Sequence, residues 1–138
     1  MSQTITVLYG LSGASCRCQL AEHVADAILR NKYCLYVVLD QEVERATYLV
    51  YSRLKDSAAW SSRMEDQVGL TVRGMPIGAC TLDHLHELLR SQTIRPNVLA
   101  IDYATMLDLG LRHPDPLKVQ NELLDFAISA KVEIITYI

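Results

Sequence analysis

The segment Cys34-Leu35-Tyr36-Val37-Val38-Leu39 is apolar throughout and leads into the acidic residues Asp40 and Glu42. A strand with one side facing solvent alternates apolar and polar residues, whereas a strand buried on both faces is apolar without interruption. Strands of the second kind occur mainly in parallel sheets, because the helices that connect parallel strands cover both faces. This segment therefore predicts an α/β fold built on a parallel sheet.

The rest of the chain alternates strands and helices on both sides of this segment. Apolar, β-branched runs predict further strands at 4–9, 69–72, 98–101 and 132–137. Apolar residues spaced by three and four predict helices at about 17–30, 43–55, 82–89 and 116–130. Thr81 and Asp115 are the expected N-caps of the last two helices. Residues 56–67 lack a clear period and are left open between a short helix and a loop.

This pattern predicts one domain over residues 1–138, with three layers. A parallel five-stranded sheet would lie between helices on both of its faces. Ligand sites in such sheets lie beyond the carboxyl ends of the strands. The predicted strand ends carry Gly10, Asp40, Arg73 and Asp102. We therefore expect the functional site at that edge of the sheet.

Composition narrows the classes of function. Half of the 138 residues are apolar, 21% are charged and the net charge is −3, as in a globular protein. No run of Lys or Arg is present, so we expect no direct binding to nucleic acid. No apolar stretch reaches the roughly 18 residues of a membrane span, and Met1–Thr4 carries no basic residue. We expect a cytoplasmic protein without a signal peptide or membrane segment.

Cysteines and histidines form no arrangement that predicts a metal site. No C-x-x-C pair is present, and we interpret the four cysteines as reduced thiols. They are Cys16, Cys18, Cys34 and Cys80. The histidines are interpreted as ordinary surface or partly buried residues, since no catalytic partner is evident in the sequence. They are His23, His84, His86 and His113.

The segment from Gly10 to Arg17 stands where a Walker A phosphate loop would stand, between a strand and a helix. That loop reads G-x-x-x-x-G-K-[ST]. Here Ser15 replaces the second Gly, Cys16 the Lys and Arg17 the Ser or Thr. The loop thus lacks the Lys that contacts the β- and γ-phosphates and the hydroxyl that holds Mg²⁺.

Two interpretations of this segment stay open. Arg17 supplies a cation one position later than the Lys, and free amides at a helix start attract anions. Weak phosphate binding would use Gly10, Ser12, Gly13, Ser15 and Arg17. The other interpretation is a β-to-α turn of small residues that binds no ligand.

Two predicted strands end in a carboxylate. The segment 97–102 has the form of a Walker B strand, which delivers an Asp to the magnesium site, here Asp102. Asp40 follows the strand at 34–39 and is a candidate for the carboxylate that activates water. Both also fit the common use of Asp in turns and helix caps.

The order of these segments resembles the core of DnaB-type replicative helicases, within the RecA-like family of P-loop ATPases. The closest match is Leu99-Ala100-Ile101-Asp102-Tyr103, because the family also places Asp-Tyr at that strand end. Three further segments resemble the start of the family's phosphate loop, its second strand, and the strand, turn and helix start before Walker B. They are Leu8–Gly13, Tyr36–Asp40 and Leu70–Asp83.

The resemblance implies a RecA-like P-loop fold, with ATP or ADP and Mg²⁺ as ligands and a role in DNA replication. It also implies that the strand before Gly10 lies inside the sheet. The departures are the missing Lys, Asp40 in place of the family's Glu, and an insertion reduced to residues 56–67. The sequence stops after the fifth predicted strand, at Tyr137-Ile138, where the family continues to DNA-contacting loops and an arginine finger. We therefore expect a truncated RecA-like domain and not a complete helicase.

Three functional hypotheses follow. The first is a non-catalytic RecA-like module that binds protein, either a replicative ATPase or a second copy of itself, as an accessory factor or inhibitor of a helicase or recombinase. The second is a divergent nucleotide-binding protein with weak or no ATPase activity, which would use residues 10–17 and Asp102. The third is an unrelated α/β enzyme or regulator with Cys16 or Cys18 as nucleophile, since a helix start activates a thiol.

Overall fold

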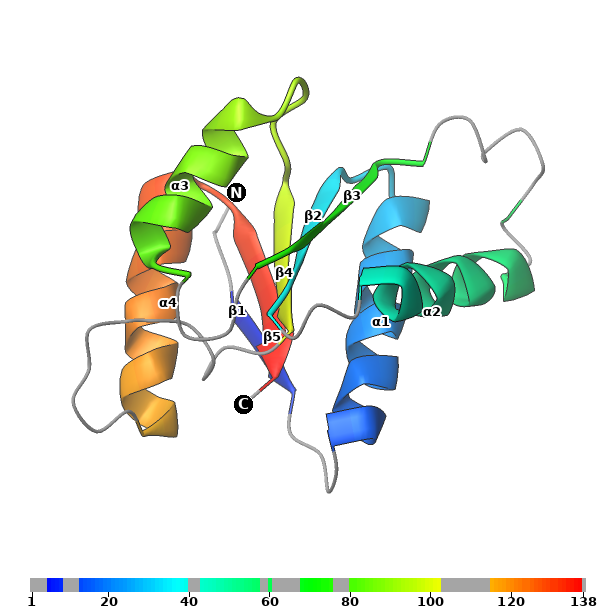
Figure 1. Ribbon diagram of the computed structural model, residues 1–138, viewed down its shortest axis with the longest axis horizontal. Helices are drawn as coiled ribbons and strands as arrows, with labels where there is room; N and C mark the ends of the chain where they lie inside the picture. The colour runs from blue at the N-terminus through cyan, green and yellow to red at the C-terminus, as the bar shows by residue number, and fades with distance from the viewer. Residues whose placement is uncertain are drawn as a thin grey trace.

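Strands and helices alternate along the chain in the order that the apolar pattern predicts (Figure 1). The computed structural model describes residues 5–8, 13–39, 43–57, 60, 68–75, 80–102 and 115–137. The strands are β1 (Ile5–Leu8), β2 (Cys34–Val38), β3 (Leu70–Gly74), β4 (Val98–Asp102) and β5 (Glu133–Tyr137). The helices are α1 (Gly13–Leu29), α2 (Val43–Asp56), α3 (Leu82–Ser91) and α4 (Pro116–Ala130).

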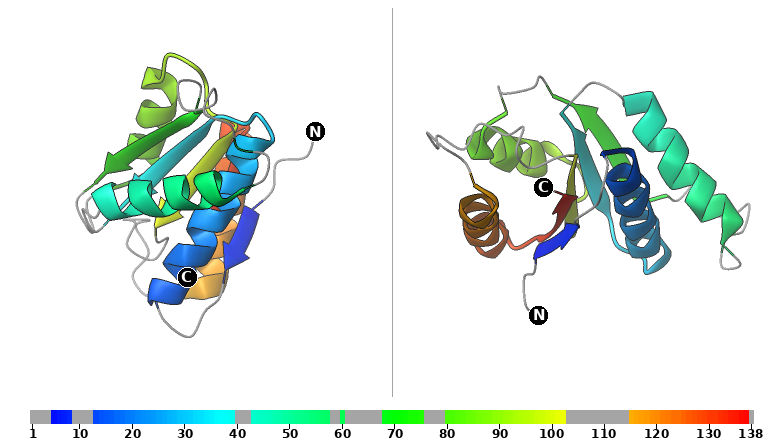
Figure 2. Two further views of the ribbon diagram at one scale, coloured as in Figure 1. Left: turned by 90° about the vertical axis from the view of Figure 1, so that its right-hand side faces the viewer. Right: turned by 90° about the horizontal axis from the view of Figure 1, so that it is seen from below.

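The five strands form one sheet, and every pair in it is parallel. Their order is β1-β5-β4-β2-β3. Helices α1 and α2 lie on one face and α3 and α4 on the other, as two views of the molecule show (Figures 1 and 2). The predicted α/β fold with a parallel sheet and helices on both faces is therefore confirmed.

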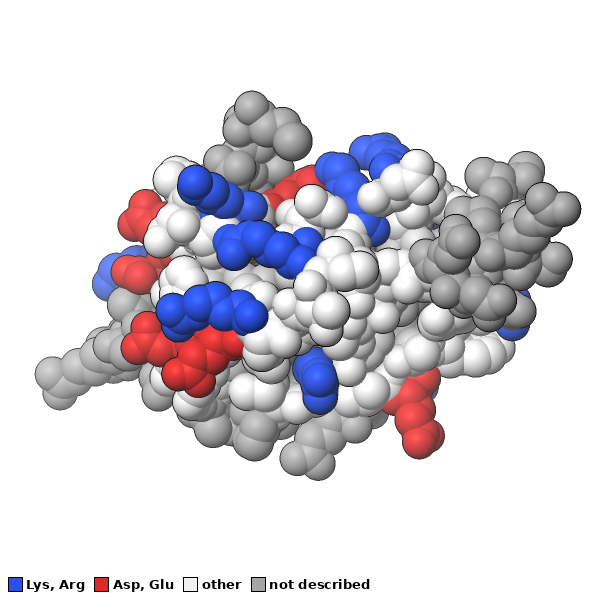
Figure 3. All heavy atoms as spheres, turned by 90° about the horizontal axis from the view of Figure 1, so that it is seen from above, with Lys and Arg blue, Asp and Glu red and all other residues white. Residues whose placement is uncertain are grey.

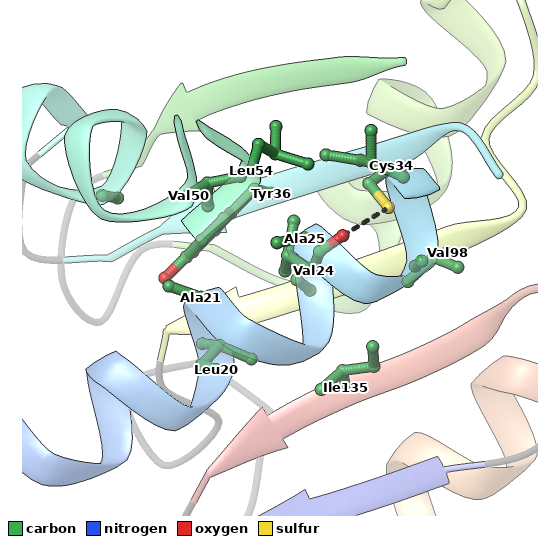
Figure 4. Close-up of a cluster of buried hydrophobic side chains, with 14 of the residues drawn as sticks. Leu20, Ala21, Val24, Ala25, Cys34, Tyr36, Val50, Leu54, Val98 and Ile135 are labelled. Atoms are coloured by element: carbon green, nitrogen blue, oxygen red, sulfur yellow. Dashed lines mark hydrogen bonds between the residues drawn. The ribbon is translucent and has the colours of Figure 1, made fainter. Parts of the chain in front are cut away.

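The uninterrupted apolar run of β2 serves two hydrophobic cores at once. Cys34, Tyr36 and Val38 point into the core beneath α1 and α2, which Figure 4 shows in close-up. Leu35 and Val37 point into the core beneath α3 and α4. Successive side chains of a strand face opposite sides, so both sets must be apolar when both faces are covered. All five residues of β2, and all five of β4, are buried.

Strand β1 lies at an edge of the sheet. It pairs with β5 on one side, and no other strand of the described residues pairs with it. The expectation that the strand before Gly10 lies inside the sheet is therefore wrong for the described part of the chain. The physical reason is that the chain passes along α1 from β1 to β2, and β5 and β4 later fill the space between them. Ile5, Thr6 and Val7 are accordingly only half-buried.

Helix boundaries follow the capping residues where these are present. Thr81 accepts a hydrogen bond from the backbone N–H of His84, whose Nδ1 accepts one from the Thr81 backbone, forming a capping box. Asp115 caps α4 by accepting from the Lys118 backbone N–H at 3.0 Å. Helix α1 begins at Gly13, four positions before the predicted start. Most of the undecided stretch 56–67 lies outside the described residues.

Candidate functional site

The topology places a candidate site at the carboxyl ends of β2 and β4. These strands are neighbours, yet β2 leads to α2 on one face and β4 leads to α4 on the other. Adjacent strands whose connections diverge in this way open a crevice where α/β proteins bind ligands. Val38 is in register with Asp102, and the Leu39 N–H donates to the Asp102 carbonyl at 2.9 Å. The last residue of β4 is thus fixed where the two connections diverge.

Asp102 and Arg17, both predicted site residues, meet at this edge of the sheet. The Arg17 Nε lies 3.4 Å from Oδ1 and 3.3 Å from Oδ2 of Asp102. The Asp102 side chain is 3% exposed and that of Arg17 is 22% exposed. The two residues are 85 positions apart in the sequence, so only the tertiary structure joins them.

Helix α1 explains how Arg17 reaches this position. The helix packs across β5 and β4, and its first turns lie over the carboxyl ends of these strands. Since the helix begins at Gly13, Arg17 lies at its fifth residue, where a long side chain can extend over the end of β4. A buried carboxylate costs several kcal/mol unless a cation compensates it. Arg17 therefore stabilises Asp102 in a place that water barely reaches.

Arg17 supplies a cation, and not an oxygen ligand for Mg²⁺, to the carboxylate of Asp102. Mg²⁺ requires oxygen ligands in near-octahedral geometry. A guanidinium already lies against both carboxylate oxygens of Asp102, and Mg²⁺ would have to displace it. Across the part of the chain that the structure describes, no group of three or more His, Cys, Asp or Glu residues could hold a metal ion.

The other predicted site residues are placed only in part. Gly13 and Ser15 lie in the first turn of α1, so the segment predicted as a loop is helical from residue 13 onward. Gly10, Ser12 and Asp40 lie outside the described residues. Among the described residues, the structure thus brings Arg17 to Asp102, with Gly13 and Ser15 one turn before it.

A polar residue that the sequence did not single out supports the end of β4 from its other side. Thr136 of β5 is fully buried, and its hydroxyl donates to the Ile101 carbonyl at 2.8 Å. It lies within a β-branched apolar run, where a Thr is usually explained by strand propensity alone. A polar side chain within the apolar run of a strand covered on both faces was the available signal.

The cysteines divide into buried and exposed thiols. Burial raises the pKa of Cys34 to about 12 and that of Cys80 to about 11, so both remain thiols at neutral pH. Cys18 is exposed and lines a groove of about 270 Å³ between α1 and α2, together with Leu49 and Arg53. Among Cys18, Cys34 and Cys80, only Cys18 keeps the accessibility that the nucleophile hypothesis requires. The side chain of Cys16, the other candidate, lies outside what the structure describes.

The described histidines have structural surroundings and lie away from Asp102. His84 completes the capping box of α3. His86 stacks on Phe126 of α4 with ring centroids 4.3 Å apart. His23 is exposed on α1, and His113 lies outside the described residues. These placements agree with the interpretation of the histidines as surface or partly buried residues.

The opposite edge of the sheet, at the amino ends of the strands, carries scattered cations. Arg30, Lys32, Arg95 and Lys131 belong to connections that enter this edge. Figure 3 shows Lys and Arg interspersed with Asp and Glu on that face. Lys32 pairs with Glu133 at 2.9 Å, and cations here also complement the helix C-termini. A hollow of about 340 Å³ lies at this edge, where the Asn97 side chain accepts from the Tyr33 N–H.

None of the helices in the described ranges combines the length and the apolar character that a bilayer-spanning segment needs. Comparison with protein-family models gives no match, and comparison with curated proteins gives none either.

Proposed function

We propose that the chain is a non-catalytic module, resembling a RecA-like ATPase core, that acts by binding protein. The observation that carries this proposal is the ion pair between Arg17 and Asp102. A carboxylate that served a magnesium–nucleotide site would face an open crevice with room for the metal. Here it is buried and lies against a cation of its own chain.

The ion pair opposes both parts of an ATPase cycle. A nucleotide that drew Arg17 to its phosphates would break the ion pair that Asp102 makes in a buried place, and this loss opposes nucleotide binding. A magnesium ion that bound Asp102 would meet the positive charge of Arg17 at short range. The edge position of β1 in the described sheet departs from what the RecA resemblance implies, and it removes one support for a triphosphate cradle at residues 10–17. The proposal therefore includes no ATP hydrolysis at this site.

A module without an active site acts through its surfaces. The proposed partner is a replicative ATPase or a second copy of the chain, and the proposed role is that of an accessory factor or inhibitor of a helicase or recombinase in DNA replication. Two features support this class of partner: the order of segments along the chain and the parallel sheet. A domain whose architecture is related to that of the partner can bind where a second copy of the partner would bind.

Calorimetry and a turnover assay test the proposal. We expect no heat of binding with ATP or ADP at about 100 μM protein, with or without Mg²⁺, and no phosphate release above background. A purified DnaB-type helicase should co-elute with the chain in size-exclusion chromatography. Motor-like ATP turnover that is lost in Asp102→Ala and retained in Arg53→Ala would overturn the proposal. Arg53 is a matched control because its pair with Glu22 is solvent-exposed.

One observation favours the second candidate, a divergent nucleotide-binding protein. Helix α1 begins at the same edge of the sheet as Asp102, and a helix N-terminus favours anions. This candidate predicts micromolar affinity for ADP that Arg17→Lys retains and Arg17→Ala loses. The first candidate predicts no binding by any of these proteins, so one titration series separates the two.

A further inference from the structure

Helix α4 carries a second apolar face in addition to the one it buries. Its buried residues include Val119, Leu123 and Phe126. Leu117, Leu124 and Ile128 are 66%, 37% and 57% exposed, and their spacing of seven and four places them on one stripe of the helix. We call these three residues the α4 stripe. The charged residues of α4 lie on a different flank; they are Lys118, Glu122 and Asp125.

The α4 stripe is turned away from α3. At 100° per residue, the stripe lies about 120–160° around the helix from the centre of the buried face. The contact between His86 of α3 and Phe126 marks the opposite flank of α4. Figure 2 shows α3 on one side of α4 and no helix of the described residues on the other side, which is the side of β1. The α4 stripe therefore lies on the side of α4 that is nearer to the edge of the sheet formed by β1.

Within the described residues, the outer edge of β1 is unpaired and carries no charge. Ile5–Leu8 pairs only with β5 within the described residues, and none of the four residues is charged. Natural edge strands usually avoid pairing by means of Lys, Pro or a bulge. Ile5 packs against the core beneath α4, so β1 and the helix that carries the α4 stripe are neighbours at this edge of the sheet.

From this surface we infer that two copies of the chain associate through β1 and α4 about a two-fold axis. The two β1 strands pair antiparallel and join the two sheets into one, and the two α4 helices pack antiparallel on the same face. A two-fold interface uses the same patch on both copies, which must therefore be self-complementary. The inference rests on the proposed function and names a second copy of the chain as the protein partner.

The spacing of sheet and helices fits this arrangement. Helix α4 packs on both β1 and β5, so its axis lies about one strand spacing, roughly 4.8 Å, from the two-fold axis. The two α4 axes are then roughly 10 Å apart, the usual distance between packed helices. A helix placed farther inside the sheet would leave a gap that side chains could not fill.

The residues on the patch are also self-complementary. A two-fold axis at Thr6 places Ile5 opposite Val7 of the second copy, and such β-branched cross-strand pairs stabilise a sheet. On the helices, antiparallel packing places Leu117 opposite Ile128 of the second copy, with Leu124 near the middle. No charged residue of β1 or α4 is brought against a like charge.

The expected affinity is modest. Helix α4 has 15 residues and a length of about 22 Å, and with the neighbouring strand edge the patch covers on the order of 500 Å² per copy. Stable interfaces usually bury about 800 Å² per partner. We therefore expect a concentration-dependent dimer with a dissociation constant of roughly 10–100 μM.

Sedimentation velocity of the full chain, from about 5 to 500 μM, measures this dimer directly. Leu117→Lys and Ile128→Glu should each weaken dimerisation about tenfold, since each buries a charge against an apolar side chain. The double variant Leu117→Lys/Ile128→Glu places Lys opposite Glu of the second copy and should restore the affinity to within about threefold. The two positions are about 16 Å apart within one helix, so they cannot pair within a copy.

Two further variants complete the design. Thr6→Lys places two like charges across the axis and should also weaken the dimer about tenfold. Tyr48→Lys is the matched control, because Tyr48 is 71% exposed on α2, and it should leave the dimer unchanged. A chain that stays monomeric at every concentration, or a double variant no better than the single ones, overturns the inference. Neither result depends on nucleotide, so the ATP assays judge the proposed function separately.

Discussion

Replacing Arg17 by Met should destabilise the chain substantially while retaining most of the apolar stem of the side chain. At 3.3 Å and an effective dielectric constant of about 20, the attraction between Arg17 and Asp102 is about 5 kcal/mol. The 22% exposure of Arg17 allows some screening, so we expect a loss of about 3 kcal/mol in the free energy of unfolding. This loss corresponds to roughly 10 °C in Tm for a chain of this length.

The assay is urea unfolding followed by circular dichroism, with two comparison variants. The double variant Arg17→Met/Asp102→Asn removes both charges and should recover about 2 kcal/mol relative to Arg17→Met. Arg53→Met breaks the exposed pair with Glu22 and should cost about 0.5 kcal/mol or less. If Arg17→Met costs no more than Arg53→Met, Asp102 is not held by Arg17 and the case against a magnesium site fails.

Four further outcomes are expected. In the native chain at pH 8, iodoacetamide should modify Cys18, because this thiol is exposed. Cys34 and Cys80 should stay unmodified, because burial raises their pKa values. Peptide mass spectrometry measures the labelling of each cysteine, and equal labelling of all three would contradict the prediction. Burial raises the pKa of Cys34 from 9.0 to about 12. The protonated thiol therefore contributes fully to stability below pH 9, and this contribution is lost as the pH rises toward 12. The free energy of unfolding should fall less steeply at alkaline pH in Cys34→Val than in the unmodified chain. Leu99→Ala, in the fully buried β4, should cost about 3 kcal/mol by urea unfolding, and a cost under 1 kcal/mol would argue against this core. Thr81→Ala should cost about 1 kcal/mol, measured in the same way, with Thr81→Ser nearly neutral.

The features that follow from local chemistry could be predicted from the sequence. The apolar runs at β2 and β4 predicted that both strands are buried on both faces, because a strand covered on two sides must be apolar throughout. Thr81 and Asp115 fixed two helix starts, since their side chains satisfy amides only a few residues away. The sequence analysis identified no capping residue for helix α1, and its predicted start was wrong by four positions.

The candidate site was visible in the sequence only as separate residues. Arg17 was expected to act on phosphate and Asp102 on magnesium, each judged from its own neighbours. Their contact depends on where α1 crosses the sheet, which involves strands far apart in the sequence. Whether two charged groups serve a ligand or neutralise each other is a question of distance, and spacing along the chain does not contain that distance.

By itself, the sequence determined the alternation of elements, the parallel character of the sheet and the composition of both cores, because periodicity and capping act over a few residues. Only the tertiary structure decided the order of the strands, the edge position of β1 and the pairing of Arg17 with Asp102. The physical reason is that several strand orders bury the same apolar residues equally well. The choice among them lies in contacts between segments that the sequence separates by dozens of residues.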